Sequence, residues 1–236
     1  MKINGSVALV TGANRGLGAA FARALLERGA STVYAGARDP STITEPGLVP
    51  VRLDVTDPDS VAAAAALCGD VTLLVNNAGV SRGDALLDGA SLDAARAELE
   101  TNYLGTLSMG RAFAPVLGRN GGGALVNMLS VLSFVTSPQL ATYAASKAAA
   151  WSLTNALRLE LREQGTQVVA VHAGYIDTDM VRSVDADKIS PAEVAARTFD
   201  GVEAGLHEVL VDHLSRSVRS ALSSDLGVLY PALGSA

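Results

Sequence analysis

The chain has 236 residues, of which 49% are apolar and 18% charged, so it can bury a large core and is not a disordered chain. Its net charge of −6 and its scattered basic residues favour neither nucleic acid nor an anionic membrane as a partner. One cysteine, Cys68, cannot form an intramolecular disulfide, and no metal site is expected. The longest apolar runs are far shorter than the roughly 20 residues of a membrane span, so a soluble, cytoplasmic protein is expected.

Short apolar segments alternate with longer helical ones along the chain, as in βαβ units around a parallel sheet. The seven predicted strands are residues 7–10, 32–35, 49–53, 71–75, 124–128, 168–172 and 209–211. The predicted helices are residues 17–28, 58–67, 92–119, 143–164 and 191–206. Asp57 and Ser190 each precede a proline at a helix start, and we expect them to cap these helices.

No repeat, charge block or flexible linker divides the chain. The sequence therefore predicts an α/β protein: a single doubly wound, Rossmann-type domain over residues 1–236, with a seven-stranded parallel sheet flanked by helices. Such sheets bind ligands outside the carboxyl ends of their strands. In the tail at 212–236, Leu214, Val218 and Leu222 recur at four-residue spacing. This spacing predicts a last amphipathic helix that packs on its own sheet or on another subunit.

The first predicted strand is followed by the sequence TGANRGLG at residues 11–18 and then by a helix. Glycines let the backbone turn tightly and approach a pyrophosphate, while the helix N-terminus attracts the anion. Such a turn can also serve only to join a strand to a helix, but its place in the first βαβ unit favours dinucleotide binding. The residues expected to contact the dinucleotide here are Gly12, Asn14, Arg15, Gly16, Leu17 and Gly18.

The end of the second strand lacks the acid that would accept a bond from a free ribose 2′-hydroxyl. Arg38 stands there instead, and Arg15 lies in the glycine turn. Two guanidiniums suit a 2′-phosphate, so NADP(H) is expected rather than NAD(H). The alternative for Arg38 is a solvated residue paired with Asp39. Asp54 and Val55, at the end of the third strand, are expected beside the adenine, although Asp54 can equally cap the following turn.

Tyr143 and Lys147 lie one helical turn apart, so both side chains leave the same face of the predicted helix. A free tyrosine ionises at about pH 10, and we expect the Lys147 ammonium to lower the pKa of Tyr143 so that it serves as general acid and base. Ser130, at the end of the fifth strand, is expected to donate to the substrate oxygen. The alternatives are an ordinary strand-end serine and an exposed helix face.

The order and spacing of these motifs resemble the short-chain dehydrogenase/reductase family, in its short, NADP(H)-preferring branch, over residues 2–211. Further matching pieces are NNAG at residues 76–79, Asn102 within TNYLG, and residues 173–178. The resemblance implies that Asn102 completes a catalytic tetrad with Ser130, Tyr143 and Lys147, by bending its helix and holding a water that connects Lys147 to solvent. It also implies cofactor contacts from Asn77, Ala78, Gly79, Tyr143, Lys147, Gly174, Ile176 and Thr178.

One position departs from the family pattern, because Ala173 stands where the family usually has proline. The loop after the sixth strand, beneath the nicotinamide, is therefore expected to be more mobile, with Gly174 keeping the freedom for positive φ. His172 is interpreted as a strand-end residue rather than a catalyst.

The predicted substrate pocket is largely apolar and includes the loop at about 175–190. Its expected lining residues are Ser130, Leu132, Leu140, Tyr143 and Tyr175. Arg82 is expected either to meet an anionic group or to be solvated. The apolar lining favours an aldehyde or ketone, so the sequence predicts an NADP(H)-dependent carbonyl reductase that also oxidises alcohols. The alternatives are a 3-oxoacyl-thioester reductase on the same scaffold and a non-catalytic NADP(H)-binding sensor.

The two longest predicted helices, 92–119 and 143–164, are expected to form an interface between subunits. Their outward faces are predicted to carry Met109, Phe113, Trp151 and Leu157, although Trp151 can equally be a core residue. A homodimer or homotetramer is therefore predicted.

Overall fold

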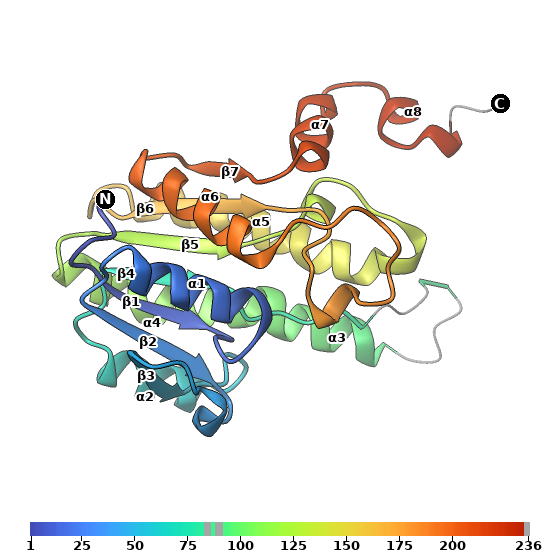
Figure 1. The fold of residues 1–236 in the computed structure, drawn as a ribbon. Helices are drawn as coiled ribbons and strands as arrows, with labels where there is room; N and C mark the ends of the chain where they lie inside the picture. The colour runs from blue at the N-terminus through green and yellow to red at the C-terminus, as the bar shows by residue number, and fades with distance from the viewer. Residues whose placement is uncertain (83–85, 88–91, 234–236) are drawn as a thin grey trace.

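Seven parallel strands form the centre of the protein, in the spatial order β3-β2-β1-β4-β5-β6-β7 (Figure 1). The computed structural model describes residues 1–82, 86–87 and 92–233. The strands are β1 (Val7–Thr11), β2 (Thr32–Ala37), β3 (Leu48–Arg52), β4 (Leu73–Asn76), β5 (Ala124–Met128), β6 (Gln167–His172) and β7 (Glu208–Leu210). All neighbouring pairs are parallel, which confirms the predicted doubly wound, Rossmann-type sheet of seven strands.

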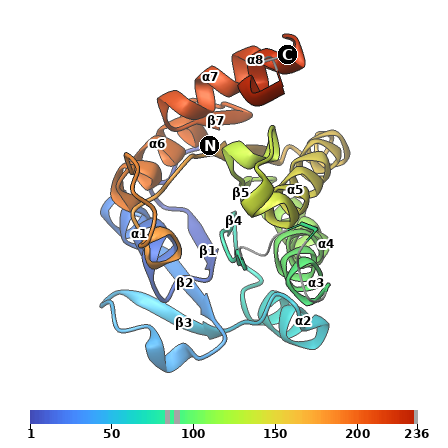
Figure 2. The same ribbon diagram turned by 90° about the vertical axis from the view of Figure 1, so that its right-hand side faces the viewer.

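Helices cover both faces of the sheet (Figure 2). The helices on one face are α1 (Gly16–Glu27) and α6 (Pro191–Glu203), and those on the other are α2 (Pro58–Leu67), α4 (Thr106–Arg119) and α5 (Ala141–Glu160). On the first face Phe21 and Phe199 pack edge to face, with ring centres 5.6 Å apart. On the second face Leu9 of β1 and Phe113 of α4 belong to one buried cluster. The strands between the two cores are therefore mainly apolar, as expected of parallel strands buried on both sides, and the buried amides of Asn76 and Asn127 bond each other over 2.9 Å.

The predicted helix 92–119 consists of three successive pieces. They are α3 (Asp93–Leu99), a π-helical segment (Glu100–Gly105) and α4. The Asn102 side chain lies in the π-helical segment and exchanges two bonds with the backbone of Val80, each 2.9 Å long. A π-helical turn inserts an extra residue and changes the helix direction, so the bend that the family resemblance implies at Asn102 is present.

Three residues expected on an outward face instead point into the core. Met109 and Phe113 are fully buried and Leu157 nearly so, because they lie on the faces of α4 and α5 that cover the sheet. Trp151 is half-buried and packs edge to face on Phe134, with ring centres 4.8 Å apart. Met109, Phe113 and Leu157 therefore do not supply the subunit interface that was predicted from them, while the role of Trp151 stays a prediction.

The predicted helix caps are formed. The backbone N–H of Asp59 donates to Asp57 at the start of α2, over 3.0 Å, and that of Glu193 donates to Ser190 at the start of α6, over 3.1 Å. The amphipathic tail helix is α7 (His213–Ala221), which lies beyond β7 and is followed by α8 (Leu226–Leu229) (Figure 1). The sequence did not predict α8 or the short 3-10 turns Pro40–Thr42, Val131–Ser133, Pro138–Leu140, Asp179–Val181 and Pro231–Leu233.

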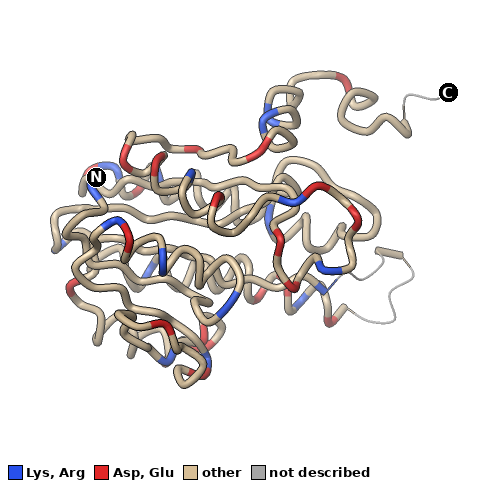
Figure 3. The backbone as a smooth tube through the Cα atoms, in the orientation of Figure 1, with Lys and Arg blue, Asp and Glu red and all other residues tan. Residues whose placement is uncertain are grey.

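Basic and acidic residues are interspersed along the described chain (Figure 3). Among the described helices, none is long and apolar enough to cross a membrane. In the same part of the chain, no group of three or more potential metal ligands is found.

Candidate active site

The carboxyl ends of β1 and β4 lie side by side at the point where the strand order reverses. The chain leaves β1 for α1 on one face of the sheet and leaves β4 for the helices on the other face. The two connections diverge there, and doubly wound sheets bind their ligands at such a point.

The glycine turn after β1 is shaped by conformations that favour glycine. Gly12 and Gly16 have φ values of +64° and +54°. Gly18 has an ordinary φ, but a Cβ there would lie 2.0 Å from the carbonyl oxygen of Gly12 and 2.7 Å from Nδ2 of Asn77. Its role is therefore to let α1 pack tightly against the turn. Leu17, between these glycines, is buried in the core next to α1, whereas Asn14 is exposed.

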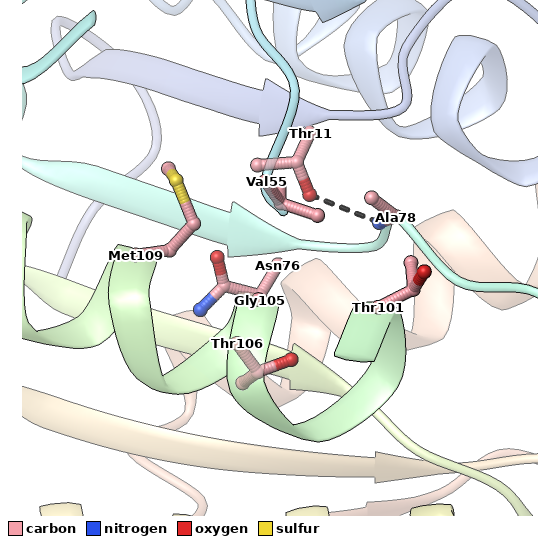
Figure 4. A pocket seen from close by; sticks show the side chains of 8 residues that line it. All are labelled: Thr11, Val55, Asn76, Ala78, Thr101, Gly105, Thr106 and Met109. Carbon is pink, nitrogen blue, oxygen red and sulfur yellow. Dashed lines mark hydrogen bonds between the residues drawn. The ribbon is translucent and has the colours of Figure 1, made fainter. Parts of the chain in front are cut away.

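Thr11 joins the glycine turn to the end of β4. Its hydroxyl accepts hydrogen bonds from the backbone N–H groups of Asn77 and Ala78, both over 2.9 Å (Figure 4). The Asn77 side chain returns a bond to the backbone carbonyl of Thr11 over 3.0 Å. The side chains that converge beneath this junction come from β1, β4, α4, the π-helical segment and the loops after β3 and β4: Thr11, Val55, Asn76, Ala78, Thr101, Thr106 and Met109 (Figure 4). Asn77 and Ala78 are thus fixed against the turn before any ligand is considered.

The two arginines expected at the adenosine ribose have different surroundings. Arg15 forms an ion pair with Asp179 over 3.5 Å, with side chains 74% and 56% exposed. Arg38 forms no ion pair with any described residue, and Asp39 instead accepts bonds from the backbone and hydroxyl of Ser41. The proposed Arg38–Asp39 pair is therefore not formed.

Asp54 caps the turn that follows β3, as one of its two alternatives predicted. Its carboxylate accepts from the backbone N–H of Thr56 over 3.0 Å and from the Thr56 hydroxyl over 2.7 Å. Partial burial alone would raise the pKa of Asp54, but the two Thr56 bonds and the positive charge of Arg38 outweigh it and lower the pKa. Arg38 therefore directs its positive potential toward the end of β3.

Ser130 and Tyr143 meet at the carboxyl end of β5. The Ser130 hydroxyl accepts from the backbone N–H of Leu132 over 3.1 Å, at the start of the turn Val131–Ser133. Tyr143, in the first turn of α5, hydrogen-bonds the Ser130 side chain. The tyrosine is partly accessible, yet its hydroxyl is enclosed by protein, and this burial raises its pKa to about 12. The bond to Ser130 lowers the pKa only in part, and the negative charge of Glu98 raises it further.

The expectation that Lys147 lowers the pKa of Tyr143 is wrong, because this pKa is raised and Lys147 is not among its causes. The Lys147 ammonium donates to the carbonyl oxygen of Met128 over 2.9 Å and lies 5.8 Å from the centre of the Tyr143 ring. Lys147 is itself buried, which lowers its pKa from 10.5 to about 8 and weakens the positive charge that it can offer. The burial of Tyr143 therefore has a larger effect on its pKa than the positive charge of Lys147.

Asn102 and Gly79 lie beside Lys147, as the resemblance implies. A Cβ on Gly79 would be 3.0 Å from Oδ1 of Asn102 and 3.6 Å from Nζ of Lys147. The Asn102 amide also donates to the hydroxyl of Ser146 over 2.9 Å, which ties the π-helical segment to α5. The four residues predicted as a tetrad are thus gathered at one end of the sheet from three separate elements.

The loop after β6 is anchored by a residue that the sequence analysis missed. The backbone N–H of Gly174 donates to the Asp212 carboxylate over 2.6 Å, and the other oxygen of Asp212 accepts from Ser215 over 2.7 Å and caps α7. Gly174 does not adopt positive φ, and a Cβ there would lie 3.1 Å from Leu214. The loop is therefore tied down despite the missing proline. An aspartate directly before the predicted tail helix was the only sequence signal for this cap.

The same loop brings Thr178 to the glycine turn. A Cβ placed on Gly16 would lie 3.4 Å from Cγ2 of Thr178. The Thr178 hydroxyl donates to the carbonyl of Ile176 over 3.3 Å. Ile176 in turn pairs with Ile189 in an isolated parallel bridge. The glycine turn and the loop after β6, which are both predicted to contact the cofactor, are thereby adjacent in space.

The predicted substrate-side residues differ in how far they are exposed. Leu132 and Leu140 are half-buried in the turns before α5, while Tyr175 is 37% exposed. The exposed Arg82 donates through its backbone N–H to the buried carboxylate of Glu98 over 2.7 Å. The hydroxyl of Tyr230, in the tail after α8, accepts from the backbone of Thr136 over 3.3 Å, so the tail contacts the loop between Ser130 and Tyr143.

Comparison with known proteins agrees with this geometry. The family model described as short chain dehydrogenase matches residues 6–189. The chain is 38% identical over 214 residues to a cis-4-hydroxycyclohexanecarboxylate dehydrogenase of Sinomonas cyclohexanicum, covering 86% of this chain and 85% of that protein. It is 32% identical over 214 residues to the 3-oxoacyl-acyl-carrier-protein reductase FabG of Vibrio harveyi, covering 87% and 85%.

A solved structure resembles the whole chain. A short chain dehydrogenase from Burkholderia cenocepacia J2315, crystallised in complex with NADP, superposes with a TM-score of 0.94 at 44% identity and covers 99% of both chains. The fold and the grouped serine, tyrosine and lysine define an oxidoreductase built on a dinucleotide-binding sheet. The chain belongs to the short-chain dehydrogenase/reductase family.

Proposed function

We propose that the protein is an NADP(H)-dependent carbonyl reductase that also oxidises alcohols. The observation that carries this proposal is the meeting of Ser130 and Tyr143 beside Lys147 at the carboxyl end of β5. A bound NADPH supplies the hydride for the carbonyl carbon. The Ser130 hydroxyl holds the carbonyl oxygen, and Tyr143 gives that oxygen its proton.

The protonation state of Tyr143 suits the proton donor that a carbonyl reduction needs. With a pKa of about 12, the phenol retains its proton throughout the neutral range. A reduction needs a proton donor next to the oxygen that becomes an alcohol, and a protonated phenol bonded to Ser130 is such a donor. Lys147, buried beside Asn102 and Gly79, would bind the nicotinamide ribose, and its buried ammonium supports this role.

The residues at the adenosine end favour NADP(H). Each charge-assisted bond from Arg15 or Arg38 to a 2′-phosphate would contribute about 1.5–3 kcal/mol. The exposed ion pair of Arg15 with Asp179 is worth at most about 1 kcal/mol, so its loss costs less than the new bond contributes. Ala37 leaves the site without a carboxylate that would repel the phosphate. The NADP complex of the Burkholderia cenocepacia relative supports the same choice.

The substrate class is an aldehyde or ketone with apolar bulk, because the predicted pocket residues Leu132 and Leu140 are apolar and half-buried. The second candidate is a 3-oxoacyl-thioester reductase, favoured by the 32% identity to the Vibrio harveyi enzyme. A panel of benzaldehyde, cyclohexanone, ethyl acetoacetate and an acetoacetyl thioester, followed by NADPH absorbance, separates the two. Faster turnover of the thioester than of every free carbonyl would select the second candidate.

The role of Tyr143 is tested by Tyr143→Phe. Because positioned acid and base groups contribute about 10²- to 10⁴-fold, turnover should fall by that factor while NADPH affinity stays close to that of the wild type. Tyr34→Phe is the matched control, since Tyr34 bonds the surface residue Asp70 and is remote from Ser130. Turnover of Tyr143→Phe at the wild-type rate would reject the assignment of Tyr143. If the wild-type protein itself binds NADPH but turns over no carbonyl, the sensor alternative is selected.

Cofactor choice is tested by kcat/KM for NADPH and NADH. NADPH should be preferred at least about tenfold, and Ala37→Asp combined with Arg38→Leu should shift the preference toward NADH. An equal or higher kcat/KM for NADH in the wild type would refute the role of the two arginines.

The homodimer or homotetramer and the cytoplasmic location stay predictions. The apolar residues that α3, the π-helical segment and α5 leave exposed, Leu99, Leu104 and Leu159, now carry the expectation of a subunit interface. A monomer in light scattering at micromolar concentration would reject it.

A further inference from the structure

His172, the last residue of β6, is fully buried directly behind Ser130. The extensions of β5 and β6 run together here, since Leu129 donates to Val171 and Val131 donates to Ala173, both over 2.8 Å. The backbone carbonyl of Ser130 points out of this ladder. It accepts from Ser133 over 2.9 Å, and Nδ1 of His172 lies 3.1 Å away.

The partner of Nδ1 fixes the proton arrangement of the imidazole. A carbonyl oxygen can only accept, so Nδ1 carries the proton and Nε2 holds a lone pair. Nε2 has no hydrogen-bond partner among the described residues, and its nearest carboxylate oxygen, on Glu208, is 3.8 Å away. Burial lowers the pKa of His172 to about 4, and the positive charges of Arg219 and Lys147 add to this against the opposing charge of Glu208. The ring is therefore neutral at physiological pH.

Aromatic and charged side chains hold the ring in this orientation. Phe134 stacks on the imidazole with ring centres 4.1 Å apart and planes 20° from parallel, and Trp151 meets it edge-on at 6.2 Å. Arg219 of α7 lies 5.7 Å from the Phe134 ring centre and bonds Glu208 of β7 over 2.9 Å. Phe134 belongs to the same turn as Ser130, so this packing fixes both ends of the turn.

We propose that His172 is a positioning residue for the proposed reaction: its Nδ1–H donates to the Ser130 carbonyl and so fixes the backbone that aims the Ser130 hydroxyl at the substrate oxygen. This inference rests on the proposed function. His172 touches no reacting atom and acts only through Ser130. Since a misplacement of about 1 Å can cost about 10²-fold in rate, loss of this bond should reduce kcat by about 10-fold to 10²-fold.

Three substitutions separate positioning from packing. His172→Asn keeps an amide donor at the place of Nδ1, His172→Gln moves the donor to the place of Nε2 near Glu208, and His172→Leu removes both. We expect His172→Asn to keep kcat within about threefold of wild type. We expect His172→Gln and His172→Leu to lose at least about 10-fold in kcat, with NADPH affinity, measured by fluorescence titration, nearly unchanged.

A double-mutant cycle with Ser130→Ala tests whether His172 acts through Ser130. The assay is NADPH oxidation by the full chain with the panel carbonyl that the wild type turns over fastest. In the Ser130→Ala background, His172→Gln should cost less than about twofold, because no hydroxyl is left to aim. A full loss in that background, or a kcat of His172→Gln equal to that of His172→Asn, overturns the inference. This last comparison decides the question even if His172→Leu does not fold. Absence of wild-type turnover on every carbonyl overturns the proposed function, and the inference with it.

Discussion

Asp212 connects the loop expected beneath the nicotinamide to the start of α7. Its replacement by alanine should loosen this loop and weaken the cap of α7. One carboxylate oxygen accepts from the backbone N–H of Gly174 over 2.6 Å, and the other accepts from Ser215 over 2.7 Å. Asp212→Ala leaves two backbone donors without these acceptors. Since Thr178 reaches the glycine turn from the same loop, the change should also loosen the cofactor site.

The magnitude follows from the two bonds. Loss of a helix N-cap costs about 1 kcal/mol, and loss of a charge-assisted bond to a backbone N–H costs about 1.5–3 kcal/mol. Together the free energy of unfolding should fall by about 2.5–4 kcal/mol. A protein of this size loses about 2–4 °C in Tm for each kcal/mol, so Tm should fall by about 5–15 °C.

The matched control is Asp57→Ala, because the Asp57 carboxylate caps α2 through a single backbone N–H. Asp57 bonds the predicted adenine residue Asp54 only through its backbone N–H, which the substitution leaves in place. This variant should lose only about 1 kcal/mol, or about 2–4 °C. Thermal unfolding by circular dichroism measures both variants, and fluorescence titration measures their NADPH affinity. If Asp212→Ala lowers Tm no more than Asp57→Ala, the two-bond reasoning is refuted. If Tm falls as calculated but NADPH affinity is unchanged, Asp212 does not support the cofactor loop.

Three further predictions test the glycine turn, the buried histidine and the proton donor. Gly18→Ala places a methyl group 2.0 Å from the Gly12 carbonyl oxygen and should destabilise the fold by at least about 1–3 kcal/mol. Gly69→Ala is the control and should be nearly neutral, because the nearest atom to its new methyl group would be 3.8 Å away. Urea unfolding measures the stability of both variants. His172 has a pKa of about 4 in the folded protein and about 6.5 in the unfolded chain, so the unfolded chain binds a proton at His172 first as the pH falls. The free energy of unfolding should therefore fall between pH 6.5 and pH 4, by about 3 kcal/mol in all. His172→Asn should lack this loss in urea unfolding at pH 7 and 4.5, and an identical pH dependence would contradict the cited burial effect. Glu98→Gln removes a negative charge that raises the pKa of Tyr143, so the fall of kcat at high pH should begin at lower pH than in the wild type; an unmoved profile would show that Glu98 does not act on Tyr143.

The fold was predictable because each local signal agreed with the others. Strands such as β5 are mainly apolar, and helices begin at capping residues such as Asp57 and Ser190. The error at Met109 and Phe113 arose from assigning apolar residues to an outward face by helix length alone. Their periodicity along α4 fits the face that covers the sheet, where both are buried.

The predicted site residues share one property: each is recognisable from its own neighbours in sequence. The four-residue spacing of Tyr143 and Lys147 indicates that they share one face of a helix. The position of Gly18 in a glycine-rich turn after a strand indicates that two backbone segments approach closely there. Asp212 and His172 carry no such signal, because their partners Gly174 and Ser130 are 38 and 42 residues away and are backbone atoms, which no side-chain pattern can reveal. The pKa of Tyr143 escaped prediction for a related reason. The spacing to Lys147 is local, but the burial that raises the pKa to about 12 depends on every element that converges at the carboxyl end of β5. Residue types at fixed spacing therefore specify which groups can react, while contacts between distant segments decide their protonation and aim.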